Sequence, residues 1–141
     1  MLDQQLQMNK FIREVIVPHQ EKKKEKGSPT LDLSHCPIAD HVEAVVKYFR
    51  LKNKKNLILQ GCNLTDKIVF DLIGPLLNMQ NFDIDCLDLS LNRLTDEGCK
   101  HLGEMLQTDK KLKKLDIGRN IQITQEGFKL LVKSVRKNTH I

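Results

Sequence analysis

A short leucine pattern recurs four times along this chain, and it restricts the fold more than any other feature of the sequence. Each copy reads L-x-L-x-x-(N/C)-x-L-(T/A)-(D/Q), with isoleucine in place of some leucines and one extra residue inserted in the last copy. The copies begin at Leu31, Leu57, Leu87 and Leu115, so their starts are 26, 30 and 28 residues apart. A nearly constant period of this length predicts a solenoid of stacked, similar units.

Each position of the pattern has a mechanical role. The L-x-L pair alternates at period two, which predicts a strand with one buried face. The Asn or Cys follows where the chain must turn, and its side chain can hydrogen-bond backbone groups that the turn leaves unpaired. Thr-Asp then supplies oxygens that suit the N-terminus of a helix.

A helix is predicted after each strand. Apolar residues recur at i, i+3, i+4 and i+7 over 42–49, 99–106 and 128–135. The second helix, 66–79, is less regular, and the dipeptide Gly74-Pro75 predicts that it kinks or restarts there.

The stretch 87–106, LDLSLNRLTDEGCKHLGEML, resembles the repeat of the ribonuclease-inhibitor-like family of leucine-rich-repeat proteins, and the resemblance covers roughly residues 28–139. It implies an α/β solenoid that forms a short right-handed horseshoe arc, with a parallel β-sheet on the concave face and α-helices on the convex face. The family includes enzyme inhibitors, GTPase-activating proteins, immune sensors, actin-filament cappers and ciliary scaffolds. Ser28 and Lys54 replace the leucine that opens this repeat, so the first two strands are predicted to begin late.

Three segments are expected from the sequence. Residues 1–17 predict an amphipathic helix that Pro18 ends, residues 18–29 a charged flexible linker, and residues 30–141 a domain of about four repeats. A solenoid exposes the core of its first repeat, so we expect the helix to cap it. The alternative is a helix that binds a partner.

Composition narrows the class of protein. Hydrophobic residues make up 40% and aromatic residues 4%, so the core must be aliphatic. The net charge of +5 is modest and does not indicate any particular class of binding partner. The four cysteines lack zinc-ligand spacing, and no apolar run is long enough to span a membrane. The polar N-terminus does not read as a signal peptide, so a reducing cytoplasmic or nuclear setting is expected, with no metal and no cofactor.

Repeats in register place equivalent side chains in rows on the concave sheet. One row carries aspartates, which predicts an acidic face that receives Lys or Arg from a protein partner. The alternative is that aspartate is merely common at this repeat position and stays solvated there. The residues predicted to contact a partner on this face are Asp32, Gln60, Asp85, Asp88, Ser90, Asp116 and Arg119.

A second candidate surface is basic. Lysines gather at the rim where helices end and strands begin, although cations also suit helix C-termini for structural reasons. Such a rim could bind acidic protein, phosphoinositide or nucleic acid, but the absence of interleaved aromatics argues against single-stranded nucleic acid. The rim residues predicted to bind are Lys110, Lys111, Lys113 and Lys114.

The cysteines are expected to be structural. Cys36 and Cys62 occupy the turn position, and Cys99 occupies a core position on the third helix. Cys86 falls on a strand position that faces outward, so it is the thiol expected to react most readily. The alternative is an ordinary exposed cysteine, because no His or cationic residue precedes it in the strand to activate it.

No phosphate-binding loop, nucleophile elbow or metalloprotease motif is present, so the sequence predicts no enzyme. We therefore expect a non-enzymatic adaptor or scaffold that binds protein through the concave sheet or the charged rim. The alternative is a regulator of an enzyme, such as an inhibitor or a GTPase-activating protein that projects Arg119. A third hypothesis is membrane or nucleic-acid attachment through the N-terminal helix and the lysine-rich linker, which the weak charge disfavours. The uncovered edge of the fourth strand also suggests self-association.

Overall fold

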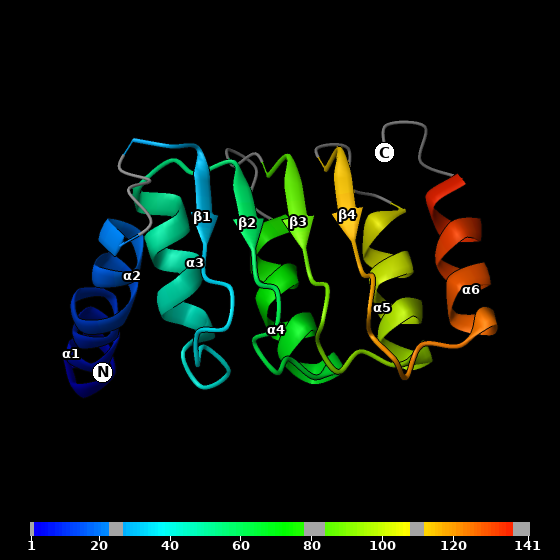
Figure 1. Ribbon diagram of the computed structural model, residues 1–141, viewed down its shortest axis with the longest axis horizontal. Coiled ribbons are helices and arrows are strands. Elements are labelled where there is room, and N and C mark those ends of the chain that lie inside the picture. Colours follow the sequence, from blue (N-terminus) through cyan, green and yellow to red (C-terminus); the bar gives the residue numbers. More distant parts are fainter. Residues whose placement is uncertain (1, 23–26, 78–83, 108–111, 137–141) are drawn as a thin grey trace.

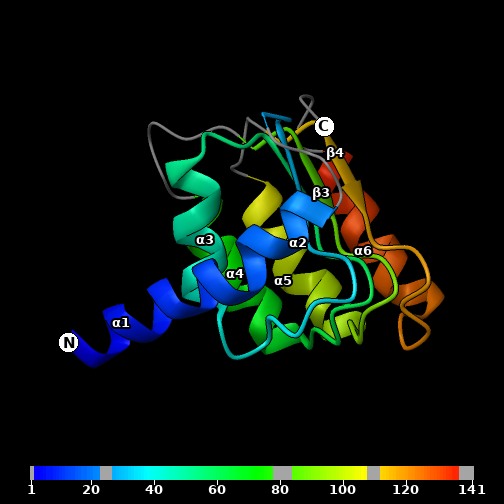
Figure 2. The same ribbon diagram turned by 60° about the vertical axis from the view of Figure 1, so that its left-hand side comes forward.

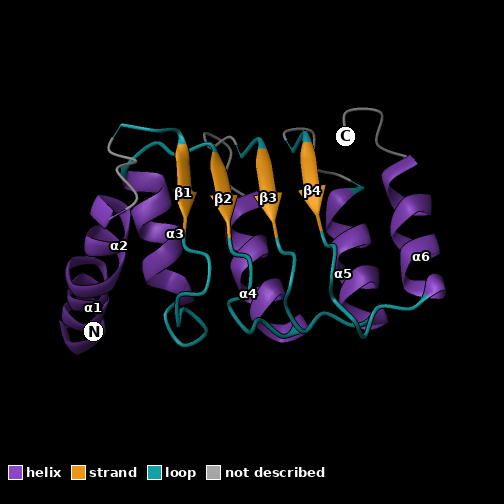
Figure 3. Cartoon of the chain, viewed as in Figure 1, coloured by secondary structure: helices purple, strands orange, loops and turns teal. Residues whose placement is uncertain are grey.

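The structure is a computed structural model that describes residues 2–22, 27–77, 84–107 and 112–136. In these residues a sheet forms one layer and the helices that follow its strands form the other, as Figure 1 and Figure 3 show. The strands are β1 (Thr30–Asp32), β2 (Asn56–Ile58), β3 (Cys86–Asp88) and β4 (Lys114–Asp116). The helices are α1 (Leu2–Phe11), the π-helix η1 (Ile12–Ile16), α2 (Val17–Lys22), α3 (Val42–Leu51), α4 (Asp66–Leu77), α5 (Asp96–Leu106) and α6 (Gln125–Arg136).

The sheet is parallel, and its strands lie in sequence order, β1-β2-β3-β4. Leu31, Leu57, Leu87 and Leu115 are partners across all three strand pairs, so the repeats are in register. This arrangement confirms the prediction of an α/β leucine-rich-repeat solenoid with a parallel sheet.

The prediction that the first two strands begin late is wrong. Thr30 pairs with Asn56, and Asn56 pairs with Cys86, so all strands start at the same level. Lys54 stands where the third repeat has the buried Ile84, and it is itself buried. Its Nζ donates a hydrogen bond to Ser28 O at 2.6 Å, so the stem can occupy an apolar site while the ammonium is satisfied.

The core is aliphatic, as composition requires. The first and third positions of each L-x-L pair point between the two layers, and so does the apolar residue after the turn. Fully buried members include Leu31, Leu33, Ile38, Leu57, Leu59, Leu64, Leu72 and Phe49. At β4 the burial weakens: Leu115 is half-buried, because no further strand covers it among the described residues.

Buried asparagines join successive repeats. Asn92 Oδ1 accepts hydrogen bonds from Cys62 N and Leu64 N, both at 3.0 Å. Its Nδ2 donates to Leu59 O and Leu89 O at 2.9 Å and to Ser90 O at 3.1 Å. One side chain therefore satisfies the turn of its own repeat and that of the preceding one. The hydrogen-bonding role predicted for the turn position is confirmed.

Asn120 repeats the arrangement one unit later. Its Oδ1 accepts from Leu94 N at 3.0 Å, and its Nδ2 donates to Leu89 O and Ile117 O. The equivalent position in the second repeat is Cys62, whose Sγ lies 3.0 Å from Leu33 O.

A second contact between repeats uses the aspartates at the starts of α4 and α5, Asp66 and Asp96. Asp66 Oδ1 accepts from Thr95 N at 2.9 Å, and Asp66 Oδ2 accepts from the Thr95 hydroxyl. Asp96 receives the same two groups from Thr124. Within the predicted Thr-Asp pair it is the threonine that caps the helix, because Thr95 Oγ1 accepts from Glu97 N.

These aspartates need room in the following helix. A Cβ added at Gly98 would collide with the Asp66 carboxylate, and one at Gly127 would collide with that of Asp96. In the second repeat the position equivalent to Gly98 and Gly127 is occupied by Ile68. The aspartate of the repeat before it, Asp40, is exposed. Glycine is thus required only where the previous repeat's aspartate reaches over.

The N-terminal helix continues past Pro18, contrary to the prediction that it ends there and a linker follows. In η1 the Val17 N–H donates to Ile12 O, which is a five-residue step. This wider turn shifts the backbone before Pro18 and relieves the usual clash between a proline ring and the carbonyl four residues back. The helix reaches Lys22, and the predicted linker residues 23–26 lie outside the described residues.

The same helix packs against the first repeat at the side of β1 (Figure 2). The Phe11 ring stacks on the His41 imidazole with centroids 4.1 Å apart, and Ile16 is fully buried. Gln20 Nε2 donates to Asp32 O at 3.0 Å and so satisfies a carbonyl of the edge strand. We infer from this packing that the helix serves as the cap of the solenoid.

The helix α4 does not restart at Gly74-Pro75, because one α-helix runs from Asp66 to Leu77. Pro75 lies in the last turn, and only two residues of the helix follow it.

Replacing Asn92 with alanine should destabilise the fold by about 3 kcal/mol or more, because several buried backbone groups lose their partner. Urea unfolding of the purified chain measures this change. Gln5→Ala, at an exposed position on α1, is the control and should change stability by less than about 0.5 kcal/mol. Equal effects of the two substitutions would contradict the role assigned to Asn92.

The stability of the fold should fall in acid partly through Asp96. Hydrogen bonds from the Thr124 hydroxyl and the Thr124 backbone hold the pKa of Asp96 below its ordinary value, with a smaller contribution from the Gly127 backbone. The ionised carboxylate therefore stabilises the fold above its unfolded pKa, and this stabilisation is lost as pH falls through the lower folded pKa. Asp96→Asn should flatten the acid limb of a stability–pH profile, whereas Asp71→Asn, at an exposed position, should leave it unchanged.

Candidate functional site

The open face of the sheet carries the predicted acidic row. No helix lies over this face in the described residues (Figure 1). Asp88 and Asp116 are register partners on β3 and β4, while Asp32 has Ile58 as its partner on β2. Neighbouring strands lie about 4.8 Å apart, so the structure brings two of the three aspartates side by side.

Each aspartate in the row also has a local structural role. Its Oδ1 accepts the backbone N–H two residues on, which closes a small turn as the strand ends. The pairs are Asp32 with Ser34 at 2.9 Å, Asp88 with Ser90 at 2.9 Å, and Asp116 with Gly118 at 2.8 Å. This turn was missed at the sequence level, and it explains why aspartate recurs. It also fixes the direction of each carboxylate.

Three residues beyond the last residue of each strand, the backbone adopts the left-handed conformation. The residues are His35, Gly61, Leu91 and Arg119, with φ values of 63°, 66°, 56° and 57°. A single glycine among them was the available signal for this geometry. A Cβ on Gly61 would meet the exposed His35 imidazole, so a larger residue there would require that ring to move. The turn holds the exposed Arg119 at the end of β4.

The remaining predicted residues of this face are less accessible. Ser90 is buried and Gln60 is half-buried. Asp85 lies before β3, where its Oδ1 is 3.7 Å from Lys113 Nζ. Its carbonyl accepts hydrogen bonds from Lys113 N and Lys114 N. Asp85 is thus partly neutralised and positions the start of β4 rather than extending the acidic row.

The predicted basic rim is only partly described. Lys113 and Lys114 are exposed at the start of β4, whereas Lys110 and Lys111 lie outside the described residues. An exposed ion pair such as that between Lys113 and Asp85 contributes little stability, so Lys113 can exchange this partner for another at small cost.

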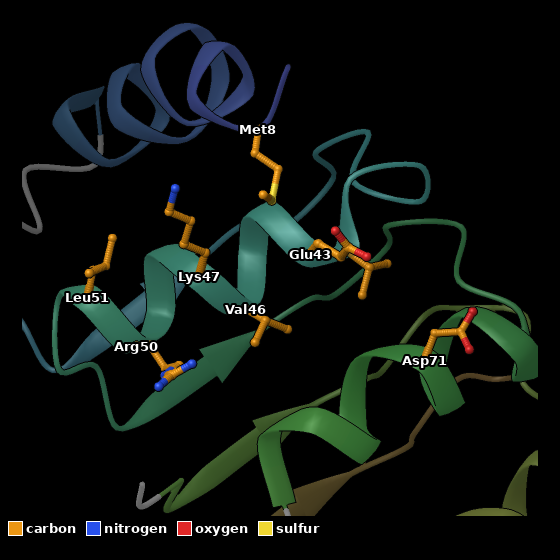
Figure 4. A pocket seen from close by; sticks show the side chains of 8 residues that line it. Met8, Glu43, Val46, Lys47, Arg50, Leu51 and Asp71 are labelled. Atoms are coloured by element: carbon orange, nitrogen blue, oxygen red, sulfur yellow. The ribbon is translucent and has the colours of Figure 1, made fainter. Parts of the chain in front are cut away.

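A groove on the helix layer was not predicted from the sequence. It lies between α3 and α4 beside α1, and its volume is about 580 Å³. Figure 4 shows Met8 reaching toward it from α1, the side chains of α3 along one wall and Asp71 on α4 opposite. The residues that line it are Met8, Val42, Glu43, Val46, Lys47, Arg50, Leu51 and Asp71.

The described residues hold neither a metal-binding cluster nor a membrane span. No group of three or more His, Cys, Asp or Glu side chains there is placed to hold a metal ion. None of the helices in these segments combines the length and the apolar character needed to cross a membrane.

The chain is similar to known proteins that carry leucine-rich repeats. Residues 80–103 match the family model described as Leucine Rich repeat. The mouse (Mus musculus) protein "NACHT, LRR and PYD domains-containing protein 4C" is 36% identical over 118 residues, which is 83% of this chain and 10% of that protein. The chain thus spans about a tenth of the length of this curated relative.

A solved structure, "Leiomodin-1 Actin-Binding Site 2 (ABS2)", superposes with a TM-score of 0.69. The match covers 87% of this chain and 72% of that one at 15% sequence identity, so the likeness is one of fold. The ribonuclease-inhibitor-like subtype stays a prediction.

Thiol chemistry should distinguish the four cysteines. Cys86 is half-buried, while Cys36, Cys62 and Cys99 are buried. Burial raises the pKa of Cys62 and of Cys99 to about 11, and the nearby Asp96 and Asp66 charges add to the effect at Cys99. A maleimide at neutral pH should therefore label Cys86 first, as mass spectrometry of peptides would show. Equal labelling of Cys62 in the folded chain would contradict this order.

Proposed function

Because the chain is a leucine-rich-repeat protein, we propose that it is a non-enzymatic adaptor or scaffold whose sheet binds a basic surface of a protein partner. The observation that carries the proposal is the acidic row on an uncovered sheet. Stacked repeats present a wide, ordered surface instead of an enclosed pocket, which suits protein recognition better than catalysis.

The turns that hold the carboxylates support this binding mode. Asp88 and Asp116 each use Oδ1 to accept a backbone N–H, so the carboxylate keeps one orientation before a partner arrives. A group that is already ordered loses little entropy on binding. The two neighbouring charges repel each other, and a Lys or Arg from a partner would relieve this repulsion. An arginine is especially suited, because its planar guanidinium can donate to two acceptors.

Arg119 and Lys114 flank the acidic row at β4, and both are exposed. A partner that fits the whole surface would therefore present basic groups over β3 and β4, with an acidic group toward Arg119. The enzyme-regulator alternative has the exposure of Arg119 in its favour, but no second group beside it completes a catalytic arrangement in the described residues.

The test removes the charges without removing the turns. In Asp88→Asn/Asp116→Asn the amide oxygen can still accept the backbone N–H, so the fold should persist while the acidic row is lost. Crosslinking capture with quantitative mass spectrometry should show proteins whose recovery falls at least about tenfold with this variant, since opposite charges across an interface govern association.

Glu97→Gln/Glu104→Gln, at exposed positions on α5, is the matched control and should leave that recovery unchanged. The crosslinked peptides of a genuine partner should be rich in Lys or Arg. A set of partners indifferent to the sheet variant would reject the sheet as the binding surface.

A further inference from the structure

The N-terminal helix has two faces with different surroundings. Met8, Phe11 and Ile12 pack against the first repeat. Asp3, Leu6 and Lys10 share the opposite side of the helix, because residues three and four apart lie on one face. All three are exposed, and Leu6 is 59% exposed. Figure 2 shows α1 projecting away from the body of the molecule.

The charges on this exposed face follow a simple order. An acid, Asp3, lies near the N-terminus, Leu6 lies in the middle, and a base, Lys10, lies near the C-terminal end of α1. Seven residues separate the two charges, which places them about 10.5 Å apart along the axis at 1.5 Å per residue.

The groove beside α3 offers charges that complement this order. Glu43 lies in the first turn of α3 and Arg50 in its last turn, again seven residues apart. Both side chains are exposed, and Val42 and Val46 give the wall between them an apolar character. Leu51, 67% exposed, extends this apolar surface beyond Arg50. Asp71 lies across the groove (Figure 4), and its Oδ2 is 3.3 Å from Lys67 Nζ.

A helix that lies antiparallel to α3 would match this pattern. With Asp3 opposite Arg50, Lys10 falls opposite Glu43, because the two charge pairs have the same spacing. Leu6 then lies between them, over the apolar wall. Within one chain α1 already contacts α3 through its other face, where Lys47 Nζ donates to Asn9 Oδ1 at 3.0 Å. The exposed face can therefore meet a second molecule.

We propose that the occupant of this groove is α1 of a second copy of the chain, and that the exchange is reciprocal. Each α1 then packs on its own first repeat through one face and in the groove of its partner through the other. Such a contact is isologous, so it closes as a dimer with twofold symmetry instead of growing into a filament. The surface lies on the helix layer and leaves the acidic sheet exposed in both copies.

Sedimentation of the full chain over a concentration series tests the proposal. The wild-type chain should form a dimer, and Asp3→Lys alone or Arg50→Glu alone should weaken it by about tenfold or more, because each places like charges together twice per dimer. The double variant Asp3→Lys/Arg50→Glu should recover the dimer. Lys100→Glu, an exposed change on α5, is the control and should leave the dimer intact.

Mixing the two single variants, Asp3→Lys and Arg50→Glu, gives the sharpest measurement. In a mixed dimer the two substituted side chains carry opposite charges and face each other, while the unchanged Asp3 faces the unchanged Arg50. Both contacts are then complementary, so native mass spectrometry should find the mixed dimer well above either homodimer. A wild-type chain that stays monomeric into the millimolar range would overturn the proposal and leave the groove to a different protein. A dimer unaffected by either charge reversal would overturn it as well.

Discussion

The structure depends on backbone groups at the strand ends finding partners away from water. Every repeat turns sharply after its strand, and the turn lies inside the stack, where an unpaired amide or carbonyl is costly. Asn92 and Asn120 resolve this with side chains that accept from one repeat and donate to two. The amide of asparagine has both acceptor and donor capacity, and only such a group can serve both kinds of backbone atom.

The first turn shows what happens without an asparagine in the next repeat. Cys62 offers a thiol, a weak donor that reaches Leu33 O but is a poor acceptor for amides. The first turn accordingly bonds within itself: Cys36 N donates to Leu33 O, and Ile38 N donates to Cys36 O. The substitution at one repeat therefore changes the hydrogen bonding of the turn before it.

The sequence predicted the solenoid well because its signal is periodic and repeated. The predictions were wrong where a single residue occupies an environment that its type usually avoids. Lys54 reads as a polar residue that delays a strand, yet its long stem lets it take an apolar site. Pro18 reads as a helix end, yet a π-turn just before it accommodates the ring. Such compensation depends on neighbours that a local pattern does not include.

The candidate surfaces were predictable to different degrees. The aspartate row follows directly from the register of the strands, since the repeat fixes which residues are neighbours. The groove beside α3 does not, because its depth depends on how far apart α3 and α4 pack and on where α1 lies. Neither distance is encoded in a single repeat. The sequence groups lysines at the rim, but in the structure Lys113 lies 3.7 Å from the Asp85 carboxylate as an ion-pair partner.

The aspartates that reach from one repeat to the next also set a rule for the order of the units. Some repeats have an aspartate whose carboxylate contacts the next repeat. The repeat that follows then has glycine three residues after its threonine, as Gly98 does beside Asp66 and Gly127 beside Asp96. The second repeat has Ile68 there and tolerates only a predecessor whose aspartate turns outward, as Asp40 does. The units are therefore not interchangeable modules. A duplication or a shuffled array would have to place a glycine-bearing repeat after each aspartate that reaches forward, which limits the orders in which the repeats can be joined.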